Sequence, residues 1–332
     1  MKSVLKIIAS LFLFSLVALP VALAAENIAA STQKGQHTYL VFGLDDAAEN
    51  TDAILLVSFN TADNTAAIIQ LPRDTFVNAD GRITKINGLY SAYKAEGLTS
   101  KKAMRLTTDF IGSSLGVSSD GYIALTTDSF RRAIDALGGV TVSLMQDFVH
   151  NDSDPGKSFT LKAGENTLDG RQSLIFVRHR KSYLTADLGR LDAQKIFISG
   201  LYNTAMKKAG HEELMTAVRE LRKGSVTNVS IMDLLIMLLK HSSKFRDTRI
   251  TYLTMPGEAV ADDDGVWYYV LNRASSEKVI KRYLSSEVNE FDADRIFFNS
   301  KNSRFAEIYE RQNLKWKEYG SDNLNGIIIP KV

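Results

Sequence analysis

Three short aliphatic runs near the start of the chain constrain the fold more than any other feature. They cover residues 38–44, 52–59 and 65–71, and polar residues separate them. Runs of this length and composition indicate buried β-strands. The connection at residues 60–64 is short enough for a hairpin. The pattern therefore predicts an antiparallel meander in which the chain reverses direction twice.

This meander would gather charged side chains at one end of the sheet. Asp45, Asp52 and Arg73 stand at or just beyond the ends of the runs, so two reversals bring them to the same edge. We expect Asp52 and Arg73 to face solvent there. Paired carboxylates together with phosphate oxygens are the usual ligands of Mg²⁺. Asp45 and Asp52 are therefore candidate metal ligands.

The rest of the chain alternates between helical and strand patterns. Helices are predicted at residues 89–95, 101–115, 130–137, 169–177, 187–207, 231–239 and 304–317, and strands at 122–126, 140–144 and 249–255. Gly138 and Gly139 should end the helix at 130–137 before the strand at 140–144. Mixed order of this kind predicts a layered α/β or α+β domain.

The N-terminal segment, residues 1–30, has the pattern of an export signal. Lys2 and Lys6 precede an uncharged run at residues 7–25, which as a helix would span roughly 28 Å, close to one hydrocarbon core. The run can serve as a membrane anchor. Pro20 and the Ala-Leu-Ala sequence at 22–24 equally fit a cleaved signal peptide. Either way, the preceding lysines predict that the remainder lies outside the cytoplasm.

Composition excludes several kinds of site. The chain of 332 residues contains no cysteine, so it has no disulfide, thiolate zinc site or cysteine nucleophile. Its five histidines lack metal-ligand spacing. A net charge of +2 opposes a general role in nucleic-acid binding. A hard cation such as Mg²⁺, held by oxygen atoms, is the metal that this composition favours.

The predicted helix at 187–207 carries a graded face. Asp187, Arg190 and Gln194 share one side, and Phe197 and Leu201 continue the same line. A polar rim thus passes into an apolar wall. An ordinary solvated first turn followed by core residues would give the same pattern.

Four segments supply cations that suit phosphate. They contain Arg73 with Asp74, Lys85 with Asn87, Arg178 with Arg180, and Arg190. Guanidinium groups match phosphate oxygens with two parallel hydrogen bonds, and an extended Arg-x-Arg would point both groups to one side. Any one of these segments alone would equally fit an ordinary ion pair on the protein surface. Their combination predicts a phosphate site.

At these residues the chain resembles the LytR-CpsA-Psr family of cell-wall glycopolymer ligases. The likeness covers about residues 38–208, and more weakly to 284, through ordered blocks. As they stand here, the blocks are VFGLD at 41–45, TDAILL at 51–56, LPRDT at 71–75, KIN at 85–87, IDALGGV at 134–140, VRHR at 177–180 and DLGR at 187–190 with Gln194. The resemblance implies a central mixed sheet flanked by helices, an apolar tunnel for a polyprenyl chain and a pyrophosphate site at its mouth.

The resemblance also implies roles for residues. Asp45 and Asp52 match the Mg²⁺-associated carboxylates. The residues matching the groups that hold pyrophosphate are Arg73, Lys85, Asn87, Arg178, Arg180, Arg190 and Gln194. Two positions depart from the family pattern, because Asn50 and Ala193 stand where the family commonly has arginine. The head-group face is therefore expected to be less basic than usual.

The implied activity is phosphoryl transfer from a polyprenyl-pyrophosphate-linked glycan to peptidoglycan. A sugar hydroxyl would attack the phosphorus nearer the glycan, and polyprenyl phosphate would leave. Asp52, Arg73, Asp74 and Arg190 are the candidate catalytic residues. Asp74 would either accept the hydroxyl proton or orient Arg73 through an ion pair.

Alternatives to transfer keep parts of the same site. A polyprenyl-pyrophosphate hydrolase would use the same cations with water, and a non-catalytic glycolipid-binding protein would keep only the apolar groove. A DNA-binding regulator is opposed by export and by the near-neutral charge. The expected organisation is a signal or anchor at 1–30, a catalytic domain at 38–285 and an extension of unknown role at 286–332.

Overall fold

The computed structural model describes residues 35–79, 81–181, 183–184, 187–208, 212–230, 248–284, 295, 303–320, 324 and 327. The export segment expected at 1–30 and the helix expected at 231–239 lie outside these residues. Among the helices of the described ranges, none is long and apolar enough to cross a membrane.

A mixed sheet of seven strands forms the centre of the molecule, in the order β11-β6-β1-β2-β3-β12-β15. Its strands are β1 (Gln36–Leu44), β2 (Thr51–Asn60), β3 (Thr65–Gln70), β6 (Gly121–Leu125), β11 (Ser225–Thr227), β12 (Arg249–Thr254) and β15 (Glu318–Gly320). The first three pair antiparallel in sequence, which confirms the predicted meander. Parallel pairing of β1 with β6 and of β3 with β12 makes the sheet mixed.

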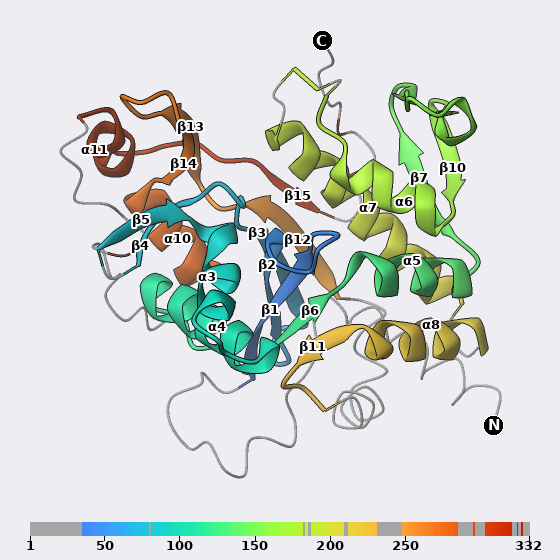
Figure 1. Cartoon of the computed structure of the whole chain (residues 1–332), viewed down its shortest axis with the longest axis horizontal. Helices are drawn as coiled ribbons and strands as arrows, with labels where there is room; N and C mark the ends of the chain where they lie inside the picture. The colour runs from blue at the N-terminus through green and yellow to red at the C-terminus, as the bar shows by residue number, and fades with distance from the viewer. Residues whose placement is uncertain are drawn as a thin grey trace.

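Helices cover both faces of this sheet (Figure 1). They are α3 (Leu89–Ala95), α4 (Ser100–Leu115), α5 (Thr127–Ala136), α6 (Gly170–Arg178), α7 (Asp187–Lys207), α8 (Glu212–Lys223), α10 (Arg273–Tyr283) and α11 (Ser303–Glu310), with short 3₁₀ turns η2 (Ile86–Gly88) and η3 (Pro155–Lys157). Four small hairpins lie outside the sheet: β4 (Phe76–Ala79) with β5 (Arg82–Lys85), β7 (Val140–Leu144) with β10 (Gly164–Leu168), β8 (Phe148–His150) with β9 (Phe159–Leu161), and β13 (Gly257–Ala261) with β14 (Trp267–Leu271).

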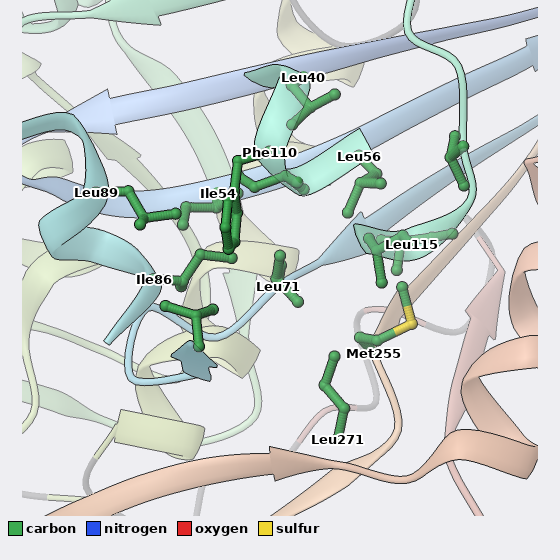
Figure 2. Packing of buried hydrophobic residues seen from close by; sticks show 14 of the residues in the cluster. Leu40, Ile54, Leu56, Leu71, Ile86, Leu89, Phe110, Leu115, Met255 and Leu271 are labelled. Carbon is green, nitrogen blue, oxygen red and sulfur yellow. The ribbon is translucent and has the colours of Figure 1, made fainter. Parts of the chain in front are cut away.

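The alternation of side chains along each strand divides the core into two halves. Leu40 and Phe42 of β1 point into a cluster with α3, α4, α10 and α11, part of which Figure 2 shows. Val41 points to the opposite face and joins a cluster with α5, α6, α7 and α8. Because helices cover both faces of the sheet, the sequences of its central strands are nearly continuous runs of apolar residues.

Glycines determine where α5 ends and how closely α7 packs on β7. Gly138 and Gly139 have φ values of +82° and +93° and end α5, as predicted. Gly200 of α7 packs on β7, where an added Cβ would lie 2.4 Å from the Thr141 carbonyl oxygen. Only glycine allows α7 to lie this close to the β7 backbone.

The C-terminal part differs from the expected helix at 304–317. Helix α11 ends at Glu310, and the following residues run without regular structure into β15. Strand β15 pairs antiparallel with β12. The expected helix is therefore wrong beyond Glu310, where residues 311–317 form the connection from α11 to β15.

Candidate active site

The loop between β1 and β2 holds Asp45 through its own backbone. The Asp45 carboxylate accepts hydrogen bonds from the Glu49 N–H at 2.9 Å and from the Asn50 side-chain amide at 2.8 Å. Burial acts to raise the pKa of Asp45, but these donors outweigh it and hold the pKa below its usual range. Asp45 is therefore ionised and fixed in place. Asn50, where the family commonly has arginine, is used to shape the loop.

Arg73 joins the end of β3 to the start of β2. Its Nη1 donates to Asp52 Oδ1 at 2.6 Å. Both side chains are largely covered, with 17% exposure for Arg73 and 16% for Asp52. The expectation that they face solvent is therefore wrong, because α6 and α7 close over this end of the sheet. Their expected meeting at one edge is what the structure shows.

Asp187, the first residue of α7, is surrounded by arginines. Its Oδ1 lies 2.9 Å from Arg190 Nη2, 3.6 Å from Arg73 Nε and 3.9 Å from Arg180 Nη1. Three guanidinium groups from different segments thus converge on one carboxylate. The polar end of the predicted helical stripe is part of this site and is not an ordinary solvated turn.

Arg178 belongs to the same group of charges. It is the last residue of α6, so the Arg-x-Arg segment is not fully extended as expected. Its Nη1 donates to both carboxylate oxygens of Asp46 at 2.8 Å, and its Nη2 lies 3.6 Å from Asp52 Oδ2. Arg178 and Arg180 nevertheless reach carboxylates that both contact Arg73. We call the set of Asp46, Asp52, Asp74, Asp187, Arg73, Lys85, Arg178, Arg180 and Arg190 the charge cluster.

Asp74 lies between two cations of the charge cluster. Its Oδ1 is 3.1 Å from Lys85 Nζ, and its Oδ2 is 4.0 Å from Arg73 Nε. The Asn87 backbone fixes the same region, because its N–H donates to the Arg73 carbonyl at 3.2 Å. These contacts place the predicted residues Lys85 and Asn87 beside Arg73. They favour an orienting role for Asp74.

Two guanidinium nitrogens in the charge cluster are buried without a hydrogen bond among the described residues: Nε of Arg73 and Nε of Arg190. Burial lowers the pKa of Arg190, and the nearby cations add to this while Asp187 opposes it. For Arg73 the effect of burial is outweighed by the carboxylates of Asp187 and Asp52, which raise its pKa. Buried N–H groups are normally hydrogen-bonded. Unsatisfied donors beside other arginines are a place where anionic oxygens would be stabilised.

An apolar cavity of about 160 Å³ opens from this cluster. Asp52, Arg178, Arg190 and Gln194 line its polar end. Its walls come from β1, β2 and the facing sides of α5, α6, α7 and α8, and include Phe130, Ile134, Leu174, Phe197, Leu201 and Leu221. Phe197 and Leu201 continue the stripe of Arg190 and Gln194 along α7, as predicted. The cavity thus has a charged mouth and a hydrocarbon interior.

Gln194 is held in position by buried polar groups. Its Nε2 donates to the Val177 carbonyl at 3.1 Å, and its Oε1 accepts from Gln70 Nε2 at 3.2 Å. Ala193 beside it is fully buried in the core. Ala193 is not among the residues that line the cavity, and the expectation of a less basic head-group face stays a prediction.

The carboxylates at the sheet end suit a divalent cation that also binds phosphate. Asp45 is ionised, and Asp52 lies next to the buried guanidinium nitrogens described above. Within the described ranges no group of three acidic or histidine residues forms a complete metal site. Mg²⁺ is commonly held by one or two carboxylates plus substrate phosphates. The residues therefore fit a metal ion that binds together with its substrate.

Sequence reasoning missed two members of the charge cluster. Asp46 was overlooked beside Asp45, although adjacent acidic residues in a strand-end loop were a usable signal. Asp187 was recognised on the helical stripe but not as the residue on which three arginines converge. That role depends on packing between segments distant in sequence.

Comparisons with known proteins identify relatives of this chain. A model described as the LytR_cpsA_psr family matches residues 20–284. The polyisoprenyl-teichoic acid–peptidoglycan teichoic acid transferase TagU of Oceanobacillus iheyensis is 32% identical over 257 residues, covering 74% of this chain and 76% of that protein.

Solved structures show the same fold. The crystal structure of B. subtilis TagV has a TM-score of 0.61 at 25% identity and covers 76% of this chain and 96% of that chain. TagT bound to LIIa-WTA has a TM-score of 0.60 at 24% identity, covering 79% and 97%. The central mixed sheet flanked by helices is therefore confirmed as the architecture.

Proposed function

The chain belongs to the LytR_cpsA_psr family, and on that premise we propose that it transfers a glycopolymer from a polyprenyl-pyrophosphate carrier to peptidoglycan. The product would be a glycopolymer joined through a phosphodiester bond. The relative from O. iheyensis carries the name of a teichoic acid transferase acting on peptidoglycan. A teichoic acid or a similar polymer is therefore the proposed cargo.

The observation that carries the proposal is the apolar cavity with cations at its mouth. A polyprenyl pyrophosphate has a long hydrocarbon tail and a doubly charged head. The cavity presents hydrocarbon walls from α5 to α8 and, at one end, Arg178, Arg190 and Gln194. A ligand of this kind would place its tail against the walls and its head against the charge cluster.

The charge cluster would act by positioning and by electrostatic stabilisation. Arg73, Arg178 and Arg190 would bind the pyrophosphate oxygens, exchanging their present carboxylate partners for phosphate. A sugar hydroxyl of peptidoglycan would attack the phosphorus nearer the glycan, and its proton would pass to solvent. The bond from that phosphorus to the bridging oxygen would break, so polyprenyl phosphate would leave with that oxygen. Fixed guanidinium groups stabilise the negative charge that develops in this step.

Asp45 and Asp52 are the proposed ligands of Mg²⁺, which when bound would neutralise charge on the pyrophosphate oxygens. Asp74 is proposed to position Arg73 and Lys85, in keeping with its contacts to both. Since peptidoglycan and a lipid carrier meet at the outer face of the cytoplasmic membrane, the protein is proposed to work there. Residues 1–30 would serve as its anchor or signal, ahead of a catalytic domain at 38–285.

A transfer assay tests the proposal directly. The full chain in detergent is mixed with a polyprenyl-pyrophosphate glycan and a peptidoglycan acceptor, with Mg²⁺ or with EDTA, and products are identified by mass spectrometry. We expect a phosphodiester-linked product that requires Mg²⁺. Phosphorylated glycan released without acceptor would show that water is the natural nucleophile. Full activity in EDTA would reject the metal site.

A further inference from the structure

A second pocket, of about 170 Å³, lies beside α7 and is separate from the apolar cavity. Asp192 and Lys195 of α7 contribute to one wall, together with Thr254 after β12 and Tyr269 of β14. The opposite wall is the segment from Lys315 to Tyr319, which contains Lys317 and Trp316. It combines aromatic rings with lysines, a composition unlike that of the hydrocarbon cavity.

Neighbouring stripes of α7 face the two pockets. Asp187, Arg190 and Gln194 lie along the stripe at the charge cluster and the cavity mouth. Leu188, Leu191 and Lys195 each lie one residue further along the chain and face the second pocket. A step of one residue turns a helix by about 100°, and a helix with its side chains is about 10–12 Å across. A ligand extending around the first turns of α7 would therefore reach both places.

Lys195 provides a buried cation in the second pocket. Its side chain is 5% exposed, and its ammonium donates to Asp192 at 2.8 Å and to the Thr254 hydroxyl at 3.0 Å. It also lies 5.8 Å from the centre of the Tyr319 ring. Lys315 and Lys317 stand exposed at the rim. Three lysines against one aspartate leave the lining with a net positive charge.

Most of one wall comes from outside the family match. That match ends at residue 284, whereas the aromatic and lysine segment starts at Lys315. The segment is fixed to the domain by several contacts. Asn272 donates to the carbonyls of Ile308 and Arg311, and Ser275 donates to that of Leu314. The pocket is therefore assembled from the family domain together with the residues that follow it.

We propose that the second pocket binds a muramyl peptide unit of the acceptor strand, with its pyranose ring on the aromatic side chains and its peptide carboxylates near the lysines, an inference that rests on the proposed transfer to peptidoglycan. Apolar faces of pyranose rings pack against aromatic side chains such as Trp316 and Tyr319. Lysines are point charges that suit isolated carboxylates, whereas the forked arginines of the charge cluster suit phosphate. In peptidoglycan the lactyl carboxyl of muramic acid is joined to the stem peptide by an amide bond, so this unit offers a pyranose ring together with the free carboxylates of its peptide. A polyol phosphate chain carries no ring.

A buried hydrogen-bond chain connects the two pockets. Lys195 donates to the Thr254 hydroxyl, which donates to Gln70 Oε1 at 3.2 Å. Gln70 Nε2 then donates to Gln194 Oε1 at the mouth of the apolar cavity. An acceptor bound at Lys195 would thus sit on a polar network that also fixes Gln194. The chain gives the second pocket a rigid position relative to the charge cluster.

Trp316 gives a local reporter for binding. The chain contains two tryptophans, and Trp267 is 61% exposed on the β13–β14 hairpin, so Trp267→Phe leaves Trp316 as the single tryptophan, which is excited selectively at the red edge of its absorption. This variant of the full chain, in detergent, is titrated with soluble uncrosslinked peptidoglycan strands. We expect saturable quenching. We expect Lys315→Glu combined with Lys317→Glu to weaken binding by about tenfold or more, because it replaces attraction by repulsion.

A matched control changes the net charge equally elsewhere. Lys278→Glu with Lys281→Glu, at exposed positions of α10, should leave the affinity within about twofold of wild type. Poly(glycerol phosphate), which carries charge without pyranose rings, should bind at least about tenfold more weakly than the strands. Equal binding of that polymer, or unchanged affinity after the Lys315 and Lys317 substitutions, would overturn the inference.

The titration tests the second pocket independently of the transfer reaction, because it needs no donor lipid. Transfer activity without quenching at Trp316 by the strands would reject the second pocket alone. Quenching that depends on the two lysines, without transfer activity, would support the pocket and reject the transfer reaction.

Discussion

The substitution Arg73→Lys separates the charge of Arg73 from its shape. The guanidinium places Nη1 at 2.6 Å from Asp52, while Nε lies 3.6 Å from Asp187 and 4.0 Å from Asp74. A lysine ammonium reaches one of these positions at a time and cannot give two parallel hydrogen bonds to phosphate. If the fork binds pyrophosphate, transfer should remain impaired although the charge is kept.

The size of the effect follows from what each variant removes. Arg73→Ala or Asp52→Ala removes a charge-stabilising group and should slow transfer by about 10² to 10⁴-fold. Arg73→Lys should slow it by about 10 to 10²-fold, because part of the electrostatic stabilisation remains. The rate is measured as phosphodiester product formed at saturating donor and acceptor.

Stability should separate the same variants. Because Arg73 is only 17% exposed, its loss leaves Asp52 and Asp187 facing each other without the cation between them. Arg73→Ala should therefore lower the free energy of unfolding by about 1–3 kcal/mol. Arg73→Lys should remain within about 1 kcal/mol of wild type.

Arg131 provides the control. It is 46% exposed on α5 and pairs only with neighbours on its own helix among the described contacts. Arg131→Lys should change neither transfer nor stability measurably. Full transfer activity in folded Arg73→Lys would refute two-point phosphate binding at Arg73.

Three further predictions follow from packing and titration. Gly200→Ala should lower the free energy of unfolding by about 2–4 kcal/mol in urea melts, because its Cβ would meet the Thr141 carbonyl at 2.4 Å; an unchanged melt would contradict the close packing of α7 on β7. Ala217→Phe, which projects into the apolar cavity, should reduce the polyprenyl lipid that co-purifies with the chain, measured by mass spectrometry against the exposed control Arg131→Lys. Burial raises the pKa of Asp120 to about 6, so this carboxyl binds more protons in the folded state between its unfolded pKa of about 4 and that value. Because Asp120 is partly exposed and solvent screens its charge, the wild type should lose about 1–2 kcal/mol of stability, relative to Asp120→Asn, as pH rises from 4 to 7, and parallel stability curves would contradict this.

Local patterns predicted the elements that build the site. The aliphatic runs predicted the strands of the meander, because a strand that is covered on both faces is apolar along its whole length. The helix at Asp187–Lys207 was predicted with its observed ends. The convergence of Asp52 with Arg73 followed from counting chain reversals. These features depend on residues close in sequence.

The rest of the site depends on contacts that no local pattern contains. The cover over Asp52 and Arg73 comes from α6 and α7, about a hundred residues away in sequence, so the expected exposure was wrong. The convergence of three arginines on Asp187 has the same origin. Strand β15 is three residues long, which is too short to show the alternation of apolar and polar residues that predicts a strand. The residues before it have the spacing of apolar residues that is typical of a helix.

The short strand β15 determines how the molecule can be shortened. It pairs with β12 at Thr251, Tyr252 and Leu253, and so covers one border of the sheet. A chain that stopped where the family match ends would leave these backbone N–H and C=O groups unpaired beside the apolar side chains of β12. Open strands of this kind recruit strands from other molecules. Such a truncated chain should therefore self-associate even though every residue of the charge cluster is retained.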